Sequence, residues 1–308
     1  MNLRRVAPLL FFAASACSVA TPQVDIMTAL VAEEVVEPAE VAKPELAEEP
    51  ALARTVDLKI TLEDSALTQG GWVRGTLPEG TQSAMIGDTP VSFDEDGNFF
   101  AAFDRDSPSS LLLTAEHKIG RSLVQPLAIA PRAWDIERIN VAKGTGGGGE
   151  AWWATREPEW LAIKEARERE TDAQGWRQEF IWPVTGRISG RFGRQRIYRG
   201  EPGSYHSGID IAPGNGTPFV APADGVVVLA RTGFSLEGGI IILDHGAGLN
   251  SAFIHLSQLS VSEGETVRQG QALGNVGATG RATGSHLHWS LVWKGNRLDP
   301  LLFLPPMP

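Results

Sequence analysis

The chain contains a single cysteine, Cys17, among its 308 residues. An intrachain disulfide is therefore impossible, and a zinc cluster built from several cysteines is excluded. Positive charge is also scarce, because 27 Lys and Arg residues stand against 37 Asp and Glu residues and give a formal net charge of −10. This balance excludes nucleic acid as an expected partner. Any metal site must be built from histidines and carboxylates.

No apolar run near the N-terminus is long enough to span a membrane, since Val6–Ala16 is too short. It follows two arginines and precedes small residues, which is the pattern of an export signal over residues 1–20. Cys17 resembles the lipobox cysteine of bacterial lipoproteins, with Ala14 where that family usually has Leu. We expect an exported protein of the periplasm or cell envelope, anchored to lipid through Cys17. Simple secretion without acylation is the alternative.

Composition divides the rest of the chain into four parts. Residues 21–54 lack aromatics and are rich in Glu, Pro and Ala, which predicts an acidic disordered tether. Short alternating runs over residues 55–130 predict a small all-β accessory domain. Residues 131–180 read as a linker with a charged helix from Glu159 to Asp172. Residues 181–308 return to a β pattern. The expected fold is mainly β: a C-terminal antiparallel β-sheet domain, an N-terminal small β-sandwich-like domain and a short helical connector.

Five of the six histidines lie between positions 206 and 288, and four of them, His206, His255, His286 and His288, are candidates for a metal or catalytic site. In His286-Leu-His288, residues two apart on a strand point to the same face, about 6.5–7 Å apart, so two imidazoles can converge. His206 and Asp210 need a bend at Gly208 to converge, because the following residues favour a loop that enters a strand. Three His or Asp ligands would leave a fourth zinc position open for water. His255 ends an apolar run. Each motif alone also fits a scattered surface histidine, so the flanking sequence decides.

With its flanks, this region resembles the lysostaphin-like (LytM-type) zinc metallopeptidases, which cut peptide bonds in peptidoglycan. The resemblance covers about residues 180–303. The region around 70–140 is similar to the small N-terminal β domain of some Gram-negative relatives. The matching motifs are His206-Ser-Gly-Ile-Asp210-Ile-Ala, Gly216-Thr-Pro-Phe-Val-Ala-Pro-Ala-Asp-Gly225, Asp244-His-Gly-Ala-Gly248, Phe253-Ile-His255-Leu-Ser257 and Thr279-Gly-Arg-Ala-Thr-Gly-Ser-His286-Leu-His288.

The resemblance implies a role for each of five residues. His206, Asp210 and His288 fall at the positions of the ligands to one zinc ion. His286 falls at the position of the general base. His255 falls at that of a second catalytic histidine, which hydrogen-bonds the water or the developing oxyanion.

Two further residues carry expectations. His245, in an Asp-His-Gly turn, is expected to be structural. Phe253 stands where many relatives have Tyr, which predicts lower activity or altered specificity if that hydroxyl contacts substrate.

The function implied is a zinc-dependent endopeptidase acting on the peptide stems of peptidoglycan, with D-Ala–diaminopimelate cross-links as the expected bond. The first alternative is a non-catalytic activator of a cell-wall amidase, like relatives that have lost the site; the five retained residues argue against it. The second is a carrier module, because Val261–Gly274 resembles part of a biotinyl or lipoyl domain. That reading fails, since no lysine occurs between Asp210 and Lys294.

Overall fold

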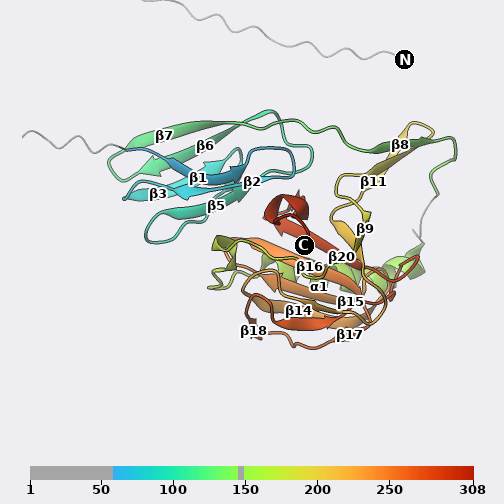
Figure 1. Ribbon diagram of the computed structural model, residues 1–308. Helices are drawn as coiled ribbons and strands as arrows, with labels where there is room; N and C mark the ends of the chain where they lie inside the picture. The colour runs from blue at the N-terminus through green and yellow to red at the C-terminus, as the bar shows by residue number, and fades with distance from the viewer. Residues whose placement is uncertain (1–57, 145–148) are drawn as a thin grey trace, which may run out of the picture. The chain divides into compact units, whose positions relative to one another are not determined.

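The computed structural model describes residues 58–144 and 149–308 (Figure 1). The predicted export signal, tether and lipobox lie outside these residues. The described residues belong to one compact unit, Val56–Pro308. They form 21 strands and one α-helix, so the predicted mainly β fold is confirmed. Within the described ranges, no helix combines the length and the hydropathy that crossing a bilayer requires.

Seven strands form two antiparallel sheets in the first part of this unit. Their buried faces carry apolar residues such as Val73, Phe99, Ala84 and Leu113, which belong to a common core. Alternation of buried and exposed residues along each strand gives each sheet one apolar face, as expected for a small sandwich. One sheet has the order β1 (Thr61–Ala66), β2 (Trp72–Thr76), β5 (Asn98–Ala102); the other has the order β4 (Thr89–Pro90), β3 (Thr81–Ile86), β6 (Ser110–His117), β7 (Arg121–Ala128).

The connector differs from the sequence expectation in two ways. A strand, β8 (Ile136–Ile139), pairs in parallel with β10 (Gln195–Tyr198), which in turn pairs with β11 (Glu201–Tyr205). The helix α1 spans Glu150–Glu168 and not Glu159–Asp172, so both predicted ends were wrong.

The longer helix has a physical reason. Pro158 lies inside α1, where it removes one backbone hydrogen bond. The helix continues through it because Arg156 and Glu159, on either side, bond to Glu237 and Ser235 of the neighbouring β-hairpin. A short 3₁₀ turn, η1 (Gly175–Arg177), follows.

An eight-stranded antiparallel sheet forms the centre of the C-terminal part, with β14, β15, β16 and β20 side by side (Figure 1). The path is β18 (Thr266–Val267), β14 (Gly225–Phe234), β15 (Gly238–Asp244), β16 (Leu249–Leu256), β20 (Leu287–Trp293), β12 (Ile209–Ala212), β9 (Arg187–Gly190), and β21 (Asn296–Leu298) pairs with β20. A small sheet of β13 (Pro218–Val220), β19 (Ala272–Asn275) and β17 (Gln258–Leu259) and the turn η2 (Pro300–Phe303) complete the chain.

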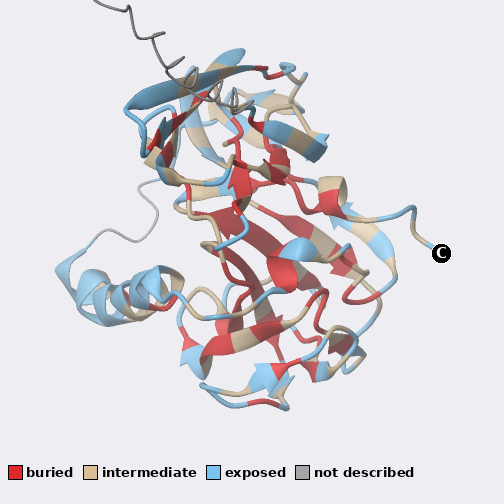
Figure 2. Cartoon of the chain, turned by 90° about the vertical axis from the view of Figure 1, so that its left-hand side faces the viewer, coloured by how far each residue is buried: buried red, intermediate tan, exposed pale blue. Residues whose placement is uncertain are grey.

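The two faces of β20 have different surroundings. Leu287, Trp289, Leu291 and Trp293 are fully buried on one face, where Trp289 stacks on Phe253 with 6.2 Å between ring centroids. Figure 2 shows a band of buried strands in the C-terminal part, whereas much of α1 is exposed. His288, Ser290 and Val292 line a groove on the other face. The predicted alternation along β20 is therefore confirmed, and it sends polar side chains away from the core.

Aromatic side chains connect the first sheet to the C-terminal turn. Trp72 on β2 lies 5.4 Å from Phe303 of η2, measured between ring centroids, and its Nε1 donates to the carbonyl of Leu302 at 3.1 Å. Phe100 on β5 lies 6.3 Å from Trp293 at the end of β20. These contacts make the apolar core continuous from the first sheet to the strand that carries His288.

Candidate metal centre

Asp210 and His288 are brought together by strand pairing. They are direct partners in the antiparallel pair of β12 and β20, where Ile209 pairs with Trp289 and Ile211 with Leu287. The Ile209 and Ile211 side chains are fully buried, so Asp210 must point to the opposite, polar face of the sheet. Directly opposed residues on one face have Cβ atoms about 4.5–5.5 Å apart, close enough to share a ligand.

His206 reaches the same point from the segment before β12. The backbone bends at Gly208, as the sequence predicted. A Cβ at this glycine would overlap the carbonyl oxygen of Trp289 and approach His288 Nε2 to 2.9 Å. Only glycine lets the segment lie this close to β20, and this close approach carries His206 back over Asp210.

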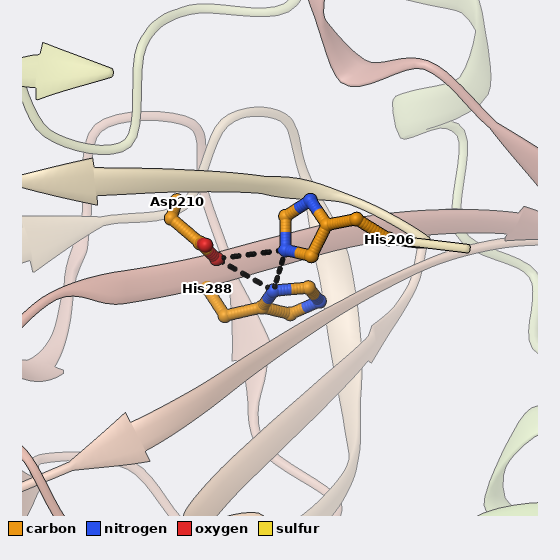
Figure 3. A group of neighbouring side chains, drawn as sticks. All are labelled: His206, Asp210 and His288. Carbon is orange, nitrogen blue, oxygen red and sulfur yellow. Dashed lines mark hydrogen bonds and ion pairs between the residues drawn. The ribbon is translucent and has the colours of Figure 1, made fainter. Parts of the chain in front are cut away.

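Three ligand-type atoms converge in this cluster (Figure 3). Asp210 Oδ1 lies 3.0 Å from His206 Nε2 and 2.8 Å from His288 Nδ1, and the two ring nitrogens are 3.1 Å apart. Ligand atoms held about 2.0–2.1 Å from a tetrahedral zinc ion lie about 3.3 Å from each other. The donor set and its spacing therefore fit a zinc ion with three protein ligands.

Main-chain carbonyls orient three of the four histidine rings. Nδ1 of His206 lies 3.1 Å from the carbonyl of Arg191, Nδ1 of His255 lies 2.9 Å from that of Thr279, and Nδ1 of His286 lies 2.9 Å from that of Gly284. A carbonyl can only accept, so each Nδ1 must donate a proton. In the neutral ring this leaves Nε2 with a free lone pair, available as a metal ligand or a proton acceptor.

The electrostatics of the cluster keep one negative charge in place. Burial opposes ionisation of Asp210, but hydrogen bonds from His206 and His288 outweigh it and hold the pKa of Asp210 well below its usual range. Burial also opposes protonation of His206; its hydrogen bond to Asp210 prevails and raises the pKa of His206. Both ring nitrogens of His206 face acceptors, so a cation at the cluster would take the place of the proton on Nε2.

His255 and His286 lie beside the cluster without belonging to it. Their ring centroids are 4.8 Å apart, and His286 Nε2 lies 3.7 Å from Asp210 Oδ1. Burial lowers the pKa of His255, which favours the neutral ring. His255 also has a left-handed backbone with φ of 66°, which is uncommon for a residue with a side chain. The five predicted site residues therefore meet in one place.

The other expected positions lie elsewhere. His245 is fully buried, with Nδ1 2.7 Å from the carbonyl of Asp224 and Nε2 2.7 Å from Ser251 Oγ, which gives it a structural place. Phe253 is fully buried on the apolar face of β16, between Phe219 and Trp289. The Phe253 side chain therefore faces the core, and the expected effect of this position on activity stays a prediction.

Sequence reasoning missed Gly190, the end residue of β9. It pairs with Asp210, and a Cβ on it would overlap Asp210 Oδ2 and lie 3.1 Å from His206 Cε1. A glycine in a predicted strand is a known sign of close backbone approach, and that was the available signal. Gly190 gives the carboxylate the room to face the two histidines.

The comparisons agree with this geometry. Residues 204–300 match the sequence profile of peptidase family M23. This segment is a peptidase M23 domain. A solved structure from Pseudomonas aeruginosa, described as an M23 peptidase, superposes with a TM-score of 0.60 at 27% identity, over 77% of this chain and 95% of that one. The shared fold thus extends beyond the matched segment.

Curated relatives carry two kinds of name. The peptidoglycan DD-endopeptidase ShyA of Vibrio cholerae is 36% identical over 125 residues, 39% of this chain and 28% of that protein. The murein hydrolase activator NlpD of Salmonella typhimurium is 36% identical over 124 residues, 40% of this chain and 31% of that protein. The chain thus spans less than a third of either relative's length.

Proposed function

We propose that this protein is a zinc-dependent endopeptidase that hydrolyses peptide cross-links in bacterial peptidoglycan, with D-Ala–diaminopimelate bonds as its substrate. The observation that carries the proposal is the convergence of His206, Asp210 and His288 beside two further histidines with free Nε2 atoms. A structural zinc site would use a fourth protein ligand. The described residues offer three, so one position is left for water and substrate.

Each residue has a distinct part in this proposal. His206, Asp210 and His288 hold one zinc ion, which when bound supplies a Lewis acid and lowers the pKa of a water molecule towards 7. His286 accepts the proton of that water at Nε2, while its Nδ1 stays bound to the carbonyl of Gly284. His255, whose Nδ1 donates to the carbonyl of Thr279, would first take up a proton at Nε2 and then donate it to the developing oxyanion or to the leaving amine.

The second candidate is an activator of a cell-wall amidase, favoured by the relative whose name describes a murein hydrolase activator. An activator has no need for a complete ligand set. The retention of all five residues in one place supports the enzyme, and the two readings make opposite predictions for isolated sacculi.

The test is digestion of purified sacculi by the zinc-loaded protein, with mass spectrometry of the released muropeptides. An endopeptidase converts cross-linked dimers to monomers, and a chelator abolishes the conversion. An activator leaves the dimers intact and instead accelerates an added amidase. Intact dimers together with amidase stimulation would establish the second reading and reject the first.

We further propose that the protein is exported and held in the cell envelope by a lipid on Cys17, a residue outside the described part of the chain. The sequence around Cys17 is the only support for this anchor. Cys17→Ala should move the protein from the membrane fraction to the soluble periplasm, as measured by fractionation. Unchanged fractionation with an unacylated N-terminus in mass spectrometry would show that the protein has no such anchor.

A further inference from the structure

An open groove of about 860 Å³ lies between α1 and the face of the central sheet that carries His288. Its floor consists of residues of β15, β16 and β20, and one wall is the face of α1 that carries Arg156, Trp160, Lys164 and Arg167. The groove reaches His288 of the candidate metal centre. Because α1 precedes the matched segment 204–300, this wall is not part of the M23 domain itself.

The floor of the groove has the length of a short peptide. In the pairing of β16 with β20, His288 lies opposite Ile254 and Val292 lies opposite Asn250. The four residue-to-residue steps from His288 to Val292 span about 13 Å along the strand. An extended peptide of about four residues covers the same distance, so a strand whose scissile bond lies at the metal centre would pass over Asn250.

Two polar atoms in this groove have no partner among the described residues. Arg167 Nε and Asn250 Oδ1 are both buried and make no hydrogen bond there. Asn250 is 3% exposed. Neighbouring cations on the same helix face are paired, since Arg156 contacts Glu237 at 2.6 Å and Lys164 contacts Glu168 at 2.8 Å. Buried polar atoms almost always have hydrogen-bond partners. The two unpartnered atoms, Arg167 Nε and Asn250 Oδ1, therefore indicate that a ligand supplies their partners.

The charge in this part of the groove favours an anion. Burial lowers the pKa of Arg167 to about 10, and the positive charge of Arg297 adds to the effect. Arg167 still carries its proton at neutral pH. The negative charge of Glu237 acts in the opposite direction, but no carboxylate of the described residues forms an ion pair with Arg167. Its planar fork therefore suits the carboxylate of a ligand.

We propose that Arg167 binds a free carboxylate of the peptide strand that lies in this groove, and that Asn250 accepts a backbone N–H of the same strand. The inference rests on the proposed function, since it takes the stem peptide as the ligand. Diaminopimelate has two carboxyl groups, and one stays free when the other is used in the chain. The groove therefore selects stem peptides with a free acid over those with an amidated one.

The test measures binding, not turnover. The probes are the tetrapeptide L-Ala-γ-D-Glu-diaminopimelate-D-Ala and the same peptide amidated on the free diaminopimelate carboxyl. Neither has the cross-link that the proposed reaction cleaves. Calorimetry compares the wild-type protein with Arg167→Gln. The matched control is Arg169→Gln, which removes the same charge from an exposed residue at the end of α1 that does not line the groove.

The wild-type protein and the control should bind the free acid roughly 10- to 100-fold more tightly than the amide, the usual effect of a charge-assisted hydrogen bond. Arg167→Gln should lose this preference. If Arg167→Gln loses its circular-dichroism signature, Arg167→Lys replaces it and should retain only a small preference. The inference would be overturned if the ratio of the affinities for the free acid and the amide were the same in the wild type and in Arg167→Gln. It would also be overturned if the wild type bound neither peptide. Digestion of sacculi by wild type tests the proposed function separately.

Discussion

His286 and His288 are two residues apart, yet they face the cluster through different ring nitrogens. His288 presents Nδ1 at 2.8 Å from Asp210 Oδ1, within the ligand triangle. His286 presents Nε2 at 3.7 Å from the same oxygen, one step outside it. A ligand must touch the metal, whereas a base must reach the water beside it, and the two distances match that division.

Alanine substitutions should separate the two roles. His288→Ala removes a ligand and should give low zinc occupancy and no activity. His286→Ala should keep its zinc and lose roughly 10²- to 10⁴-fold in turnover, the usual effect of losing a positioned proton acceptor. Elemental analysis and muropeptide digestion measure both. If His286→Ala loses zinc as fully as His288→Ala, both are ligands and His255 becomes the first candidate for the base.

Gly190→Ala should damage the centre although it removes no functional group. The new methyl group overlaps Asp210 Oδ2 and forces the carboxylate away from the two histidines. We expect zinc affinity to fall by at least tenfold, measured by competition with a chelating dye. Gly284→Ala is the control, because a Cβ there meets nothing within 4 Å and the residue lies close to His286. Similar zinc affinities in the two variants would show that Gly190 has no part in shaping the site.

The site residues were predictable to different degrees. Alternation along β20 shows that His288 shares a face with Ser290, since a strand has a fixed period of two. The pairing of Asp210 with His288 could not be predicted from the local sequence pattern. These residues are 78 positions apart, and the register between strands brings them together. Local patterns do not encode that register. The family resemblance supplied this pairing, and Gly190 stayed unnoticed because its importance depends on the same register.

At the scale of elements, α1 is held by an apolar cluster, in which Ala166 packs with residues such as Ile240 and Ile242, and by a few polar contacts. Arg156 contacts Glu237 of the hairpin between β14 and β15 at 2.6 Å, and Glu159 accepts from the backbone and side chain of Ser235. These groups lie far along the sequence from α1. The sequence therefore predicted a helix in the connector but misplaced its ends, since Pro158 reads locally as a boundary.

Glu237→Gln should loosen the helix without unfolding the sheet. The substitution removes the carboxylate from a largely buried ion pair with Arg156. Such a loss costs about 1–3 kcal/mol, which should appear as faster amide exchange in α1. Glu168→Gln breaks only an exposed ion pair with Lys164. It should change the free energy of local opening, as measured by amide exchange in α1, by less than about 0.5 kcal/mol. Equal exchange of α1 in both variants would mean that the Arg156 contact does not hold the helix.

His245, in the turn between β15 and β16, should make the fold sensitive to acid. Complete burial lowers the pKa of His245 to about 4. The folded protein keeps this ring neutral, while the unfolded chain takes up a proton below about pH 6.5. The unfolded state therefore binds more protons between pH 6.5 and 4, and stability falls as the pH falls through that window.

The expected loss through His245 is roughly 3 kcal/mol by pH 4. Denaturant unfolding at pH 7 and pH 4, with a chelator present to remove any metal effect, measures it. His245→Gln should be less stable at pH 7 because it loses bonds to Asp224 and Ser251. Between pH 7 and pH 4, the free energy of unfolding of His245→Gln should also fall by roughly 3 kcal/mol less than that of the wild type. The same pH dependence in both proteins would assign the acid sensitivity to other groups.

At the scale of the whole molecule, the described residues belong to one compact unit, Val56–Pro308. Aromatic residues connect its two β parts, since Trp72 and Phe100 of the first sheet pack on Phe303 and Trp293 of the C-terminal part. Period-two patterns show which residues are buried but not against which partner. The predicted domain limits and the accessory role of residues 55–130 stay predictions.

The central claim is that His206, Asp210 and His288 hold one zinc ion. The most direct measurement is the zinc content of purified wild-type protein, Asp210→Ala and a control, Asp172→Ala, whose side chain is exposed and far along the chain from the cluster. The prediction is about one zinc per chain in the wild type and the control and little in Asp210→Ala, because the carboxylate is the only charged ligand of the three. Equal zinc content in all three proteins would contradict the account.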